Sequence, residues 1–432
     1  MKLQNAKALV VGMEKSGRAA AAFLAAQGAD VTTTDLNQHD TPGFRIQSEK
    51  LFDEAWDLIV PSPGVPLDVP GLERARALGV QVVGEVELAA PYLLGRTIAI
   101  TGSNGKTTTT SMVGHILQSA GVAAQVGGNI GTPVIAMTAT SHADQWNVLE
   151  LSSFQLETVR TFRAHVGVCL NVTQNHLDRH HTFGNYAAAK GNLFRTQQAG
   201  DHAVLNADDE TCRSFAALTA AETSWFSGND IRDGLVWVNG SPLMALSDIP
   251  VPGRHNAENV MAAACIARIA GVSSGEIAAA VKTFKAVEHR LEFVTELNGV
   301  RFYNDSKATS VDAATKALDS FDGNLWVILG GNDKGSDDTT QRERLQRQAH
   351  AAVLIGSAAE KIAGQLAGAV KLIGAGTLDQ AVHQAWKAAK PGDTVLLAPA
   401  CASFDQFQSY EHRGLVFKEL VGELSQRYGA KA

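Results

Sequence analysis

The sequence predicts an α/β protein of three domains, of which the first and the last are Rossmann-like. Three observations support this fold class. Short apolar runs alternate with helix-length segments, a glycine-rich turn joins a strand to a helix at residues 101–108, and 432 residues are too many for one typical domain. The predicted domains span residues 1–95, 96–288 and 289–432.

The composition, 45% hydrophobic and 19% charged residues, is that of an ordinary globular protein. A net charge of −7 gives no field that would attract nucleic acid or an anionic membrane, so neither is an expected partner. The four cysteines lie far apart without a CxxC pair, which argues against a thiolate metal site or a disulfide framework. No signal-like or membrane-length apolar run is found, so a cytoplasmic location is expected. A monomer is a separate expectation, on which the sequence carries no signal.

The first domain opens with a strand, a turn and a helix. The strand Ala8–Val11 leads to a glycine, a helical segment follows, and a second strand ends at Asp35. Further strands are expected at residues 58–60 and 81–83. A dinucleotide-binding turn needs a glycine in its middle, where Glu14 stands. We therefore expect a nucleotide-like ligand bound in a modified way, with a nicotinamide cofactor or a purely structural domain as alternatives.

The central domain is predicted from Thr101-Gly102-Ser103-Asn104-Gly105-Lys106-Thr107-Thr108, which follows an apolar strand and opens a helix. The N–H groups of such a turn, the helix N-terminus and Lys106 form a cradle for phosphate oxygens. Thr107 offers a hydroxyl to the Mg²⁺ of a nucleoside triphosphate. The two glycines enclose two residues where the usual pattern has four, which favours a narrow set of ATPases over a generic kinase or GTPase. A P-loop ATPase-like domain is therefore expected.

Three further residues of the central domain are candidates for metal chemistry. Glu150 ends a predicted strand, where a carboxylate can hold Mg²⁺, with a solvated acid as the alternative. His176 lies close to His180 and His181, but no third ligand stands at a familiar zinc spacing, so surface histidines are the simpler interpretation. Lys190 lies on a helix-forming stretch, and its spacing alone predicts a surface lysine.

The last domain begins near His289-Arg290, where helical sequence gives way to strand-like sequence. A capping-box pattern at Ser273 and Glu276 opens the last helix before it. The strands expected after the boundary lie at residues 293–294, 300–302, 325–329, 352–355 and 394–398.

Several motifs resemble those of the Mur ligases, the ATP-dependent amide ligases of bacterial peptidoglycan precursor synthesis. The stretches that carry this resemblance lie at residues 102–108, 171–178, 253–259 and 289–290. Three further stretches resemble the branch of the family that adds D-glutamate, and they lie at residues 149–157, 304–309 and 399–407. The match runs through all three domains in the family's order.

The resemblance implies an ATP-dependent carbon–nitrogen ligase that adds D-glutamate to UDP-N-acetylmuramoyl-L-alanine through an acyl phosphate. A sister ligase adding another amino acid or a dipeptide is one alternative. It is disfavoured because the last domain lacks an Asp-Asn-Pro-Arg run and contains Cys401-Ala402-Ser403. A non-catalytic nucleotide-binding protein is the other alternative, and the presence of all the reactive residues argues against it.

The resemblance also implies site residues in every domain. The UDP sugar would contact Ser16, Asp35, Ser62 and Asn129, although Leu36-Asn37 stands where a polar, basic pair is expected. ATP would contact residues 102–108 together with Asn256, Asn259, Arg290 and Asp305. Two Mg²⁺ ions are expected, one on Thr107 and Glu150 and one on His176 and a carbamylated Lys190. The expected catalytic residues are Lys106, His176, Lys190 and Lys307. D-Glutamate would contact Thr309, Lys334, Ser403 and Tyr410.

Overall fold

The structure, a computed structural model, describes residues 2–285, 287–333 and 335–428. Residue contacts divide the chain into two compact units, Met1–Asp248 with Ala257–Lys282, and Ile249–Asn256 with Thr283–Ala432. Helix α11 (Arg254–Ile269) begins in the second unit and continues in the first. The predicted α/β fold class is confirmed, since the three large sheets are parallel or mainly parallel. The boundaries of the three predicted domains stay a prediction.

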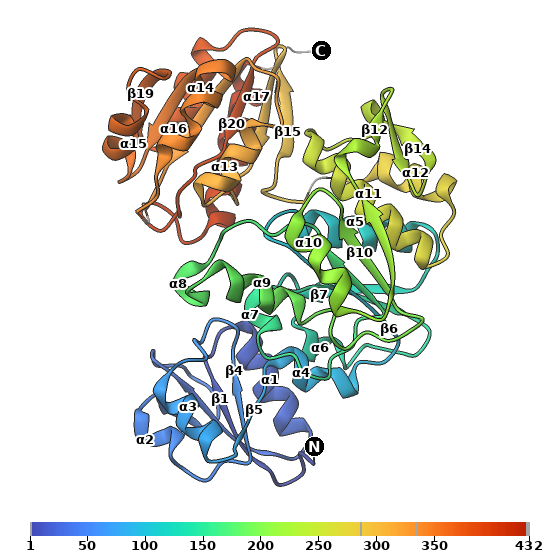
Figure 1. Cartoon of the computed structure of the whole chain (residues 1–432). Coiled ribbons are helices and arrows are strands. Elements are labelled where there is room, and N and C mark those ends of the chain that lie inside the picture. Colours follow the sequence, from blue (N-terminus) through green and yellow to red (C-terminus); the bar gives the residue numbers. More distant parts are fainter. Residues whose placement is uncertain (1, 286, 334, 429–432) are drawn as a thin grey trace. The chain divides into compact units, whose positions relative to one another are not determined.

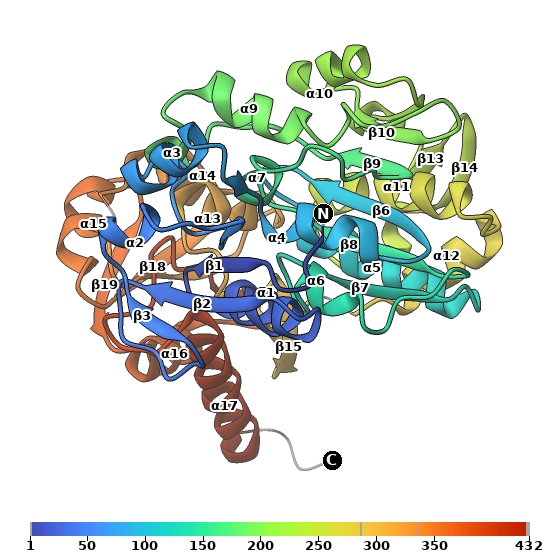
Figure 2. The ribbon, with the colours of Figure 1, turned by 90° about the horizontal axis from the view of Figure 1, so that it is seen from below.

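The first sheet contains five parallel strands in the order β3-β2-β1-β4-β5, and Figure 2 shows β1, β2 and β3 side by side. Its elements are β1 (Lys7–Val11), α1 (Lys15–Ala26), β2 (Asp30–Asp35), β3 (Phe44–Ile46), α2 (Glu49–Phe52), β4 (Leu58–Pro61), α3 (Pro70–Ala77) and β5 (Gln81–Val82). Strand β1 is central, and residues 8–11 are fully buried, which explains their continuous apolar run. The order reverses beside β1, where α/β sheets usually bind their ligands.

The second sheet contains six parallel strands in the order β11-β10-β9-β6-β8-β7. Its strands are β6 (Arg96–Thr101), β7 (Ala124–Gly128), β8 (Trp146–Glu150), β9 (Val166–Cys169), β10 (His202–Asn206) and β11 (Glu222–Phe226). Its helices are α4 (Glu85–Ala89), α5 (Lys106–Ser119), α6 (Val134–Met137), α7 (Ser153–Leu156), α8 (Leu177–His180), α9 (Phe183–Gly191) and α10 (Glu210–Ser214). Because β6 pairs with both β8 and β9, the carboxyl ends of these strands meet at one edge.

The first and second sheets share one hydrophobic core. Helices α1, α4 and α6 contact one another between the two sheets (Figure 1). Leu24 of α1, Val86 of α4 and Val134 of α6 all belong to the same buried cluster, which continues to Leu149 of β8. This continuous apolar packing explains why the two sheets form a single compact unit.

A small antiparallel sheet follows β11 and was not predicted from the sequence. It consists of β12 (Ile231–Arg232), β13 (Leu235–Val238) and β14 (Ser241–Ala245). These strands have few residues. The Arg232 guanidinium lies over the ring of Trp237, 4.5 Å from its centre. The capping box at α12 (Ser274–Thr283) is confirmed, because Ser273 N donates to Glu276 Oε2 (3.0 Å) and Glu276 N donates to Ser273 Oγ (3.4 Å).

The third sheet, in the second unit, has the order β15-β16-β20-β17-β18-β19, and only β15 runs antiparallel to its neighbour. Its strands are β15 (Glu292–Leu297), β16 (Val300–Asn304), β17 (Leu325–Gly330), β18 (Ala349–Ile355), β19 (Lys371–Gly376) and β20 (Thr394–Leu397). Its helices are α13 (Val311–Leu318), α14 (Arg342–Gln348), α15 (Ala359–Leu366), α16 (Leu378–Ala388) and α17 (Tyr410–Tyr428). Buried side chains fill both faces of the sheet.

None of the helices in the described ranges combines the length and the apolar character that a bilayer crossing requires.

Candidate active site

The phosphate loop joins β6 to α5, as its sequence predicts. Gly105 is the N-cap of α5 and has a left-handed backbone with φ of 81°. A Cβ atom at this position would lie 2.4 Å from Asn259 Oδ1, so both the conformation and the space require glycine. The fourteen-residue helix that follows directs its first N–H groups toward the loop. The turn therefore has the geometry of an anion-binding helix N-terminus.

A segment after β9 holds the phosphate loop in place. Asn104 N donates to Asn171 Oδ1 (2.9 Å), and Asn171 Nδ2 donates back to Asn104 O (3.2 Å). Thr173 N donates to Ser103 Oγ (2.9 Å), which also lies 2.9 Å from the hydroxyl of Tyr186. The loop conformation is therefore determined by residues about seventy positions further along the chain.

Two lysines meet at the loop. Lys106 Nζ donates to the carbonyl oxygens of Gly102 (2.7 Å) and Ser103 (3.0 Å). Lys190 Nζ also donates to Gly102 O (2.8 Å) and lies 4.6 Å from the ring centre of Tyr186. Lys190 is only 1% exposed, so the surface position predicted from spacing alone is wrong. Burial, followed by the charge of Lys106, lowers the pKa of Lys190 to about 7.

Glu150 lies at the carboxyl end of β8, in register with Ile100 of β6. Its Oε1 atom accepts from Asn129 Nδ2 (2.8 Å). Its Oε2 atom is buried and has no hydrogen-bond partner within the described part of the chain. A buried carboxylate oxygen without a donor is costly unless a cation binds it, so this atom fits a Mg²⁺ ligand. Thr107, the other candidate ligand, is also buried.

The histidine segment contains two exposed rings, those of His176 and His181, and one buried ring, that of His180. His176 is exposed, adopts φ of 53° and lies edge-to-face with Phe154 at 4.9 Å. Partial desolvation, followed by the charges of Lys106 and Lys190, lowers the pKa of His176 against the opposing charge of Asp178, which favours the neutral ring that can bind a metal. His180 is buried, with Nε2 3.0 Å from Ser153 Oγ and Nδ1 3.1 Å from Glu157 Oε1, which corrects its expected surface position. No cluster of three or more His, Cys, Asp or Glu metal ligands occurs in the described ranges.

The residues expected to contact a UDP sugar line one cleft of about 510 Å³ in the first unit. Ser16, Asp35, Ser62 and Asn129 all contribute to its wall. Burial opposes the ionisation of Asp35, but the N–H groups of Asn37, Met13 and Leu36 and the charge of His39 together outweigh it and lower the pKa of the carboxyl. The N–H groups of Asn37 and Met13 donate to Asp35 over 3.0 Å and 2.6 Å. The cleft thus combines a fixed carboxylate with hydroxyl and amide groups.

Glu85 connects this cleft to the packing between the two sheets. It begins α4, is 2% exposed, and accepts from the backbone N–H of Ile135 (2.5 Å) at α6. Gln155, which lines the cleft, accepts from Ser152 N (3.0 Å). Burial raises the pKa of Glu85 to about 7, although hydrogen bonds from Ile135 and Gln155 oppose the shift. The sequence contained no signal for this buried acid.

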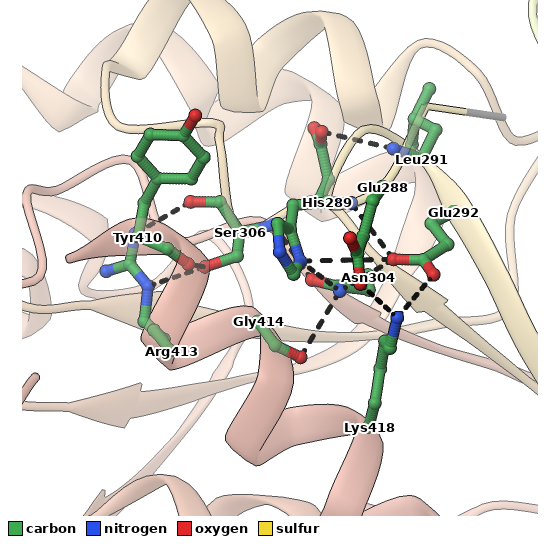
Figure 3. Close-up of polar contacts among 11 residues, drawn as sticks. Glu288, His289, Leu291, Glu292, Asn304, Ser306, Tyr410, Arg413, Gly414 and Lys418 are labelled. Carbon is green, nitrogen blue, oxygen red and sulfur yellow. Dashed lines mark hydrogen bonds and ion pairs between the residues drawn. The ribbon is translucent and has the colours of Figure 1, made fainter. Parts of the chain in front are cut away.

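In the second unit, the segment after α12 brings Arg290 to Asp305. Asp305 is buried, and burial raises its pKa to about 6 against the opposing charge of Arg290. Leu291 N donates to Asp305 Oδ1 (3.2 Å). His289, with φ of 65°, lies 3.0 Å from Asn304 through its Nδ1 atom (Figure 3). Arg290 and Asp305, two of the three residues in this unit that are expected to contact ATP, are therefore neighbours.

Arg413 joins the two loops that carry the D-glutamate candidates. Its guanidinium is fully buried and donates to Ser306 Oγ (3.0 Å), Ser306 O (2.8 Å) and Cys401 O (3.2 Å). Ser306 Oγ donates in turn to Tyr410 O (2.8 Å), as Figure 3 shows. Lys307 Nζ lies 5.1 Å from the ring centre of Tyr410. Sequence reasoning did not identify Arg413, because a lone arginine on a C-terminal helix resembles a surface residue.

Comparison with known proteins identifies the family. The model described as "Mur ligase middle domain" matches residues 100–267, and the model described as "Mur ligase, glutamate ligase domain" matches residues 289–401. A protein from Solibacter usitatus, named UDP-N-acetylmuramoylalanine–D-glutamate ligase, is 63% identical over 98% of this chain and 99% of its own length. The chain belongs to the Mur ligase family.

Two further comparisons agree with this assignment. A relative with the same printed name, from Acidobacterium capsulatum, is 53% identical to this Mur ligase over 98% of this chain and 97% of its own. The crystal structure of UDP-N-acetylmuramate-alanine ligase MurC from Thermotoga maritima aligns with a TM-score of 0.62 at 19% identity, over 97% of this chain and 99% of that one. At 19% identity, the match to the Thermotoga maritima structure shows that the two chains share a fold.

The remaining predicted residues of this Mur ligase lie in both units. Asn259, in the first unit, accepts from Thr109 Oγ1 (3.2 Å), whereas Asn256, in the second, donates to Pro252 O (2.6 Å). Ser403 is buried and Thr309 is partly buried. Lys334 lies outside the described residues. The roles of all these residues in binding stay predictions.

Proposed function

We propose that this Mur ligase joins D-glutamate to UDP-N-acetylmuramoyl-L-alanine, with ATP as the source of an acyl phosphate. The observation that carries the proposal is the 63% identity, over nearly both full chains, to a protein named for that ligation. The phosphate loop and the separate cleft of about 510 Å³ support it, because the reaction needs a place for each of two large anionic substrates.

The first chemical step activates the substrate carboxylate. A carboxylate is a poor electrophile, so one of its oxygens attacks the γ-phosphorus of ATP, and ADP leaves. Phosphoryl transfer depends on alignment and charge neutralisation, which Lys106 and the N–H groups of the phosphate loop supply. Asn129 lines the sugar cleft and donates to Glu150 Oε1 (2.8 Å), so one hydrogen bond links the proposed sugar site to the proposed metal ligand.

Two Mg²⁺ ions are part of the proposal. Thr107 and Glu150 would hold one, and His176 with a modified Lys190 would hold the other. The unpaired, buried Oε2 atom of Glu150 supports the first site. When bound, Mg²⁺ neutralises negative charge on the phosphate oxygens during transfer.

Lys190 is proposed to carry a carbamate. Its low pKa of about 7 leaves a substantial fraction of the buried amine uncharged at neutral pH. The free amine attacks the carbon of CO₂, forms an N–C bond and releases one proton. The product is a carboxylate-like group, which is a ligand for Mg²⁺ where an ammonium would repel it.

The second step forms the amide. The amine of D-glutamate attacks the acyl phosphate, a tetrahedral intermediate forms, and inorganic phosphate leaves. The amine must be unprotonated, and the proposed acceptor of its proton is a nearby carboxylate, or His176 if its ring does not hold Mg²⁺ at that step. Lys307, Thr309, Ser403 and Tyr410 are the proposed contacts of D-glutamate. Asn256, Asn259, Arg290 and Asp305 are the proposed contacts of ATP.

Each predicted domain receives one substrate in this proposal. Residues 1–95 would bind the UDP sugar, residues 96–288 would bind ATP, and residues 289–432 would bind the amino acid. A monomeric state and a cytoplasmic location remain predictions.

The test is phosphate release from ATP with Mg²⁺ and UDP-N-acetylmuramoyl-L-alanine, with D-glutamate, L-glutamate, L-lysine and D-alanyl-D-alanine offered separately. Release with D-glutamate alone is expected. Release with another amine would indicate a sister ligase and overturn the D-glutamate contacts in the second unit. No release with any amine would favour a non-catalytic nucleotide-binding protein.

A further inference from the structure

A cavity of about 900 Å³ in the first unit lies apart from the proposed active site. Its walls come from the end of β5, from α4 and the 3-10 turn Ala90–Tyr92, from the start of β6, and from the loop before β9. The phosphate loop follows the opposite end of β6. None of the residues that line this cavity lines the sugar cleft. Its volume is in the range of sites for small organic molecules.

Most of the cavity wall is apolar. Val83, Leu88, Ala90, Leu93 and Phe162 contribute to it, and all five belong to or pack against the core shared by the two sheets. Apolar surface around an open cavity stays in contact with water unless a ligand covers it, so covering it is favourable. The wall therefore favours a ligand with an apolar body.

The acidic side chain at this cavity is already saturated. Glu87 accepts from Arg160 N (2.9 Å), Thr161 N (2.8 Å), Thr161 Oγ1 (2.6 Å) and Phe162 N (3.1 Å). These four neutral donors occupy the lone pairs of the carboxylate and leave no free acceptor for a ligand cation. The same bonds fix the loop that carries Arg160.

The remaining polar groups at the cavity favour an anion. Arg160 is exposed, and its guanidinium has no hydrogen-bond partner in the part of the chain that the structure describes. Arg163 is paired in two contacts of 2.8 Å with Asp201, so that charge is compensated. His165 Nδ1 accepts from Thr97 N (3.1 Å), which places the ring hydrogen on Nε2, and burial lowers the pKa of the ring. Arg160 thus supplies a cation without an ion pair at the cavity, and His165 supplies a neutral donor.

We propose that this cavity is a binding site for an organic monoanion, a carboxylate or sulfonate attached to an aromatic or short hydrocarbon body. Arg160 contacts the anionic group, His165 Nε2 donates to it, and the apolar wall covers the body. The single uncompensated charge and the apolar wall disfavour polyanions such as nucleotides. The saturation of Glu87 disfavours organic cations.

The experiment uses the full chain and the fluorescent aryl sulfonate 1-anilinonaphthalene-8-sulfonate as the probe. Saturable one-site binding is expected, with displacement by 4-phenylbutyrate and none by 4-phenylbutan-1-ol at equal concentration. ATP and UDP-N-acetylmuramoyl-L-alanine are expected not to displace the probe.

Two variants locate the site. Arg160→Glu is expected to weaken probe binding by about tenfold or more, and Ala90→Trp, which fills the cavity, is expected to abolish it. Arg195→Glu makes the same charge change at an exposed arginine outside the cavity and should leave binding within about twofold. If Ala90→Trp fails to fold, two measurements still test the proposal. They are the affinity of Arg160→Glu for the probe and the displacement of the probe by 4-phenylbutan-1-ol. Absence of saturable binding, equal binding to Arg160→Glu, or displacement by ATP would overturn the proposal.

Discussion

Lys106 and Lys190 donate to the same acceptor, the carbonyl oxygen of Gly102, over 2.7 Å and 2.8 Å. Two ammonium groups at one oxygen repel each other, and Lys190 is also enclosed by protein. Burial and the charge of Lys106 together lower the pKa of Lys190 to about 7. The shared carbonyl therefore holds the amine of Lys190, whose charged form is disfavoured, against the phosphate loop.

Replacing Lys190 by alanine is expected to lower the rate of phosphate release by about 100-fold or more, because the carboxylate of the proposed carbamate is lost. Short carboxylic acids such as formate or acetate should restore part of the activity by occupying the vacated space. Lys387→Ala, at an exposed lysine of α16, is the control and should keep full activity. A fully active Lys190→Ala variant without added acid would contradict the carbamate.

Replacing Glu150 by glutamine is expected to raise the Mg²⁺ concentration needed for half-maximal phosphate release by about tenfold or more, because the unpaired oxygen loses its charge. Glu360→Gln at an exposed position of α15 should leave this concentration unchanged. The same Mg²⁺ titration curve for Glu150→Gln and the native chain would remove Glu150 from the metal site.

Glu85 is expected to make stability depend on pH. Its folded pKa of about 7 lies above the ordinary value of 4.5, so between these values the folded state binds more protons than the unfolded state. The contribution of Glu85 is fully present below pH 4.5 and declines as the pH rises through 7, at up to about 1.4 kcal/mol per pH unit. Glu85→Gln should lack this decline.

Urea unfolding of both proteins between pH 5 and pH 8 measures the effect. The free energy of unfolding of Glu85→Gln relative to the native chain should rise with pH across this range. Glu360→Gln should follow the native curve. A difference between Glu85→Gln and the native chain that does not change with pH would show that Glu85 does not titrate there.

Replacing Arg413 by methionine is expected to lower the free energy of unfolding by about 2–4 kcal/mol, because the carbonyls of Ser306 and Cys401 lose their buried donor. The two loops would separate, so the KM for D-glutamate should rise more than the KM for the UDP sugar. Steady-state kinetics and urea unfolding measure both effects.

Arg427→Met on the same helix, at an exposed arginine, is the matched control for Arg413 and should change neither quantity. If Arg413→Met raised both KM values equally, a general loss of structure would explain the result better than a role in positioning the two loops.

Strand and turn patterns predicted much of the fold, because they are local. The apolar run of residues 8–11 predicted a strand, and the capping box at Ser273 predicted a helix start. The small sheet β12–β14 was missed because its strands are short and pair only with one another. The buried acid Glu85 was missed because its partner Ile135 is fifty residues away.

The sequence by itself determined the α/β class, the phosphate loop and the resemblance to the Mur ligases, since each depends on short-range periodicity or on an ordered set of motifs. Only the tertiary structure decided that Lys190 is buried, that one oxygen of Glu150 is unpaired and that Arg413 joins two loops. The physical reason is the same in each case. Burial and hydrogen-bond partners come from distant segments, such as Gly102 for Lys190 and Ser306 for Arg413, at separations of 88 and 107 residues.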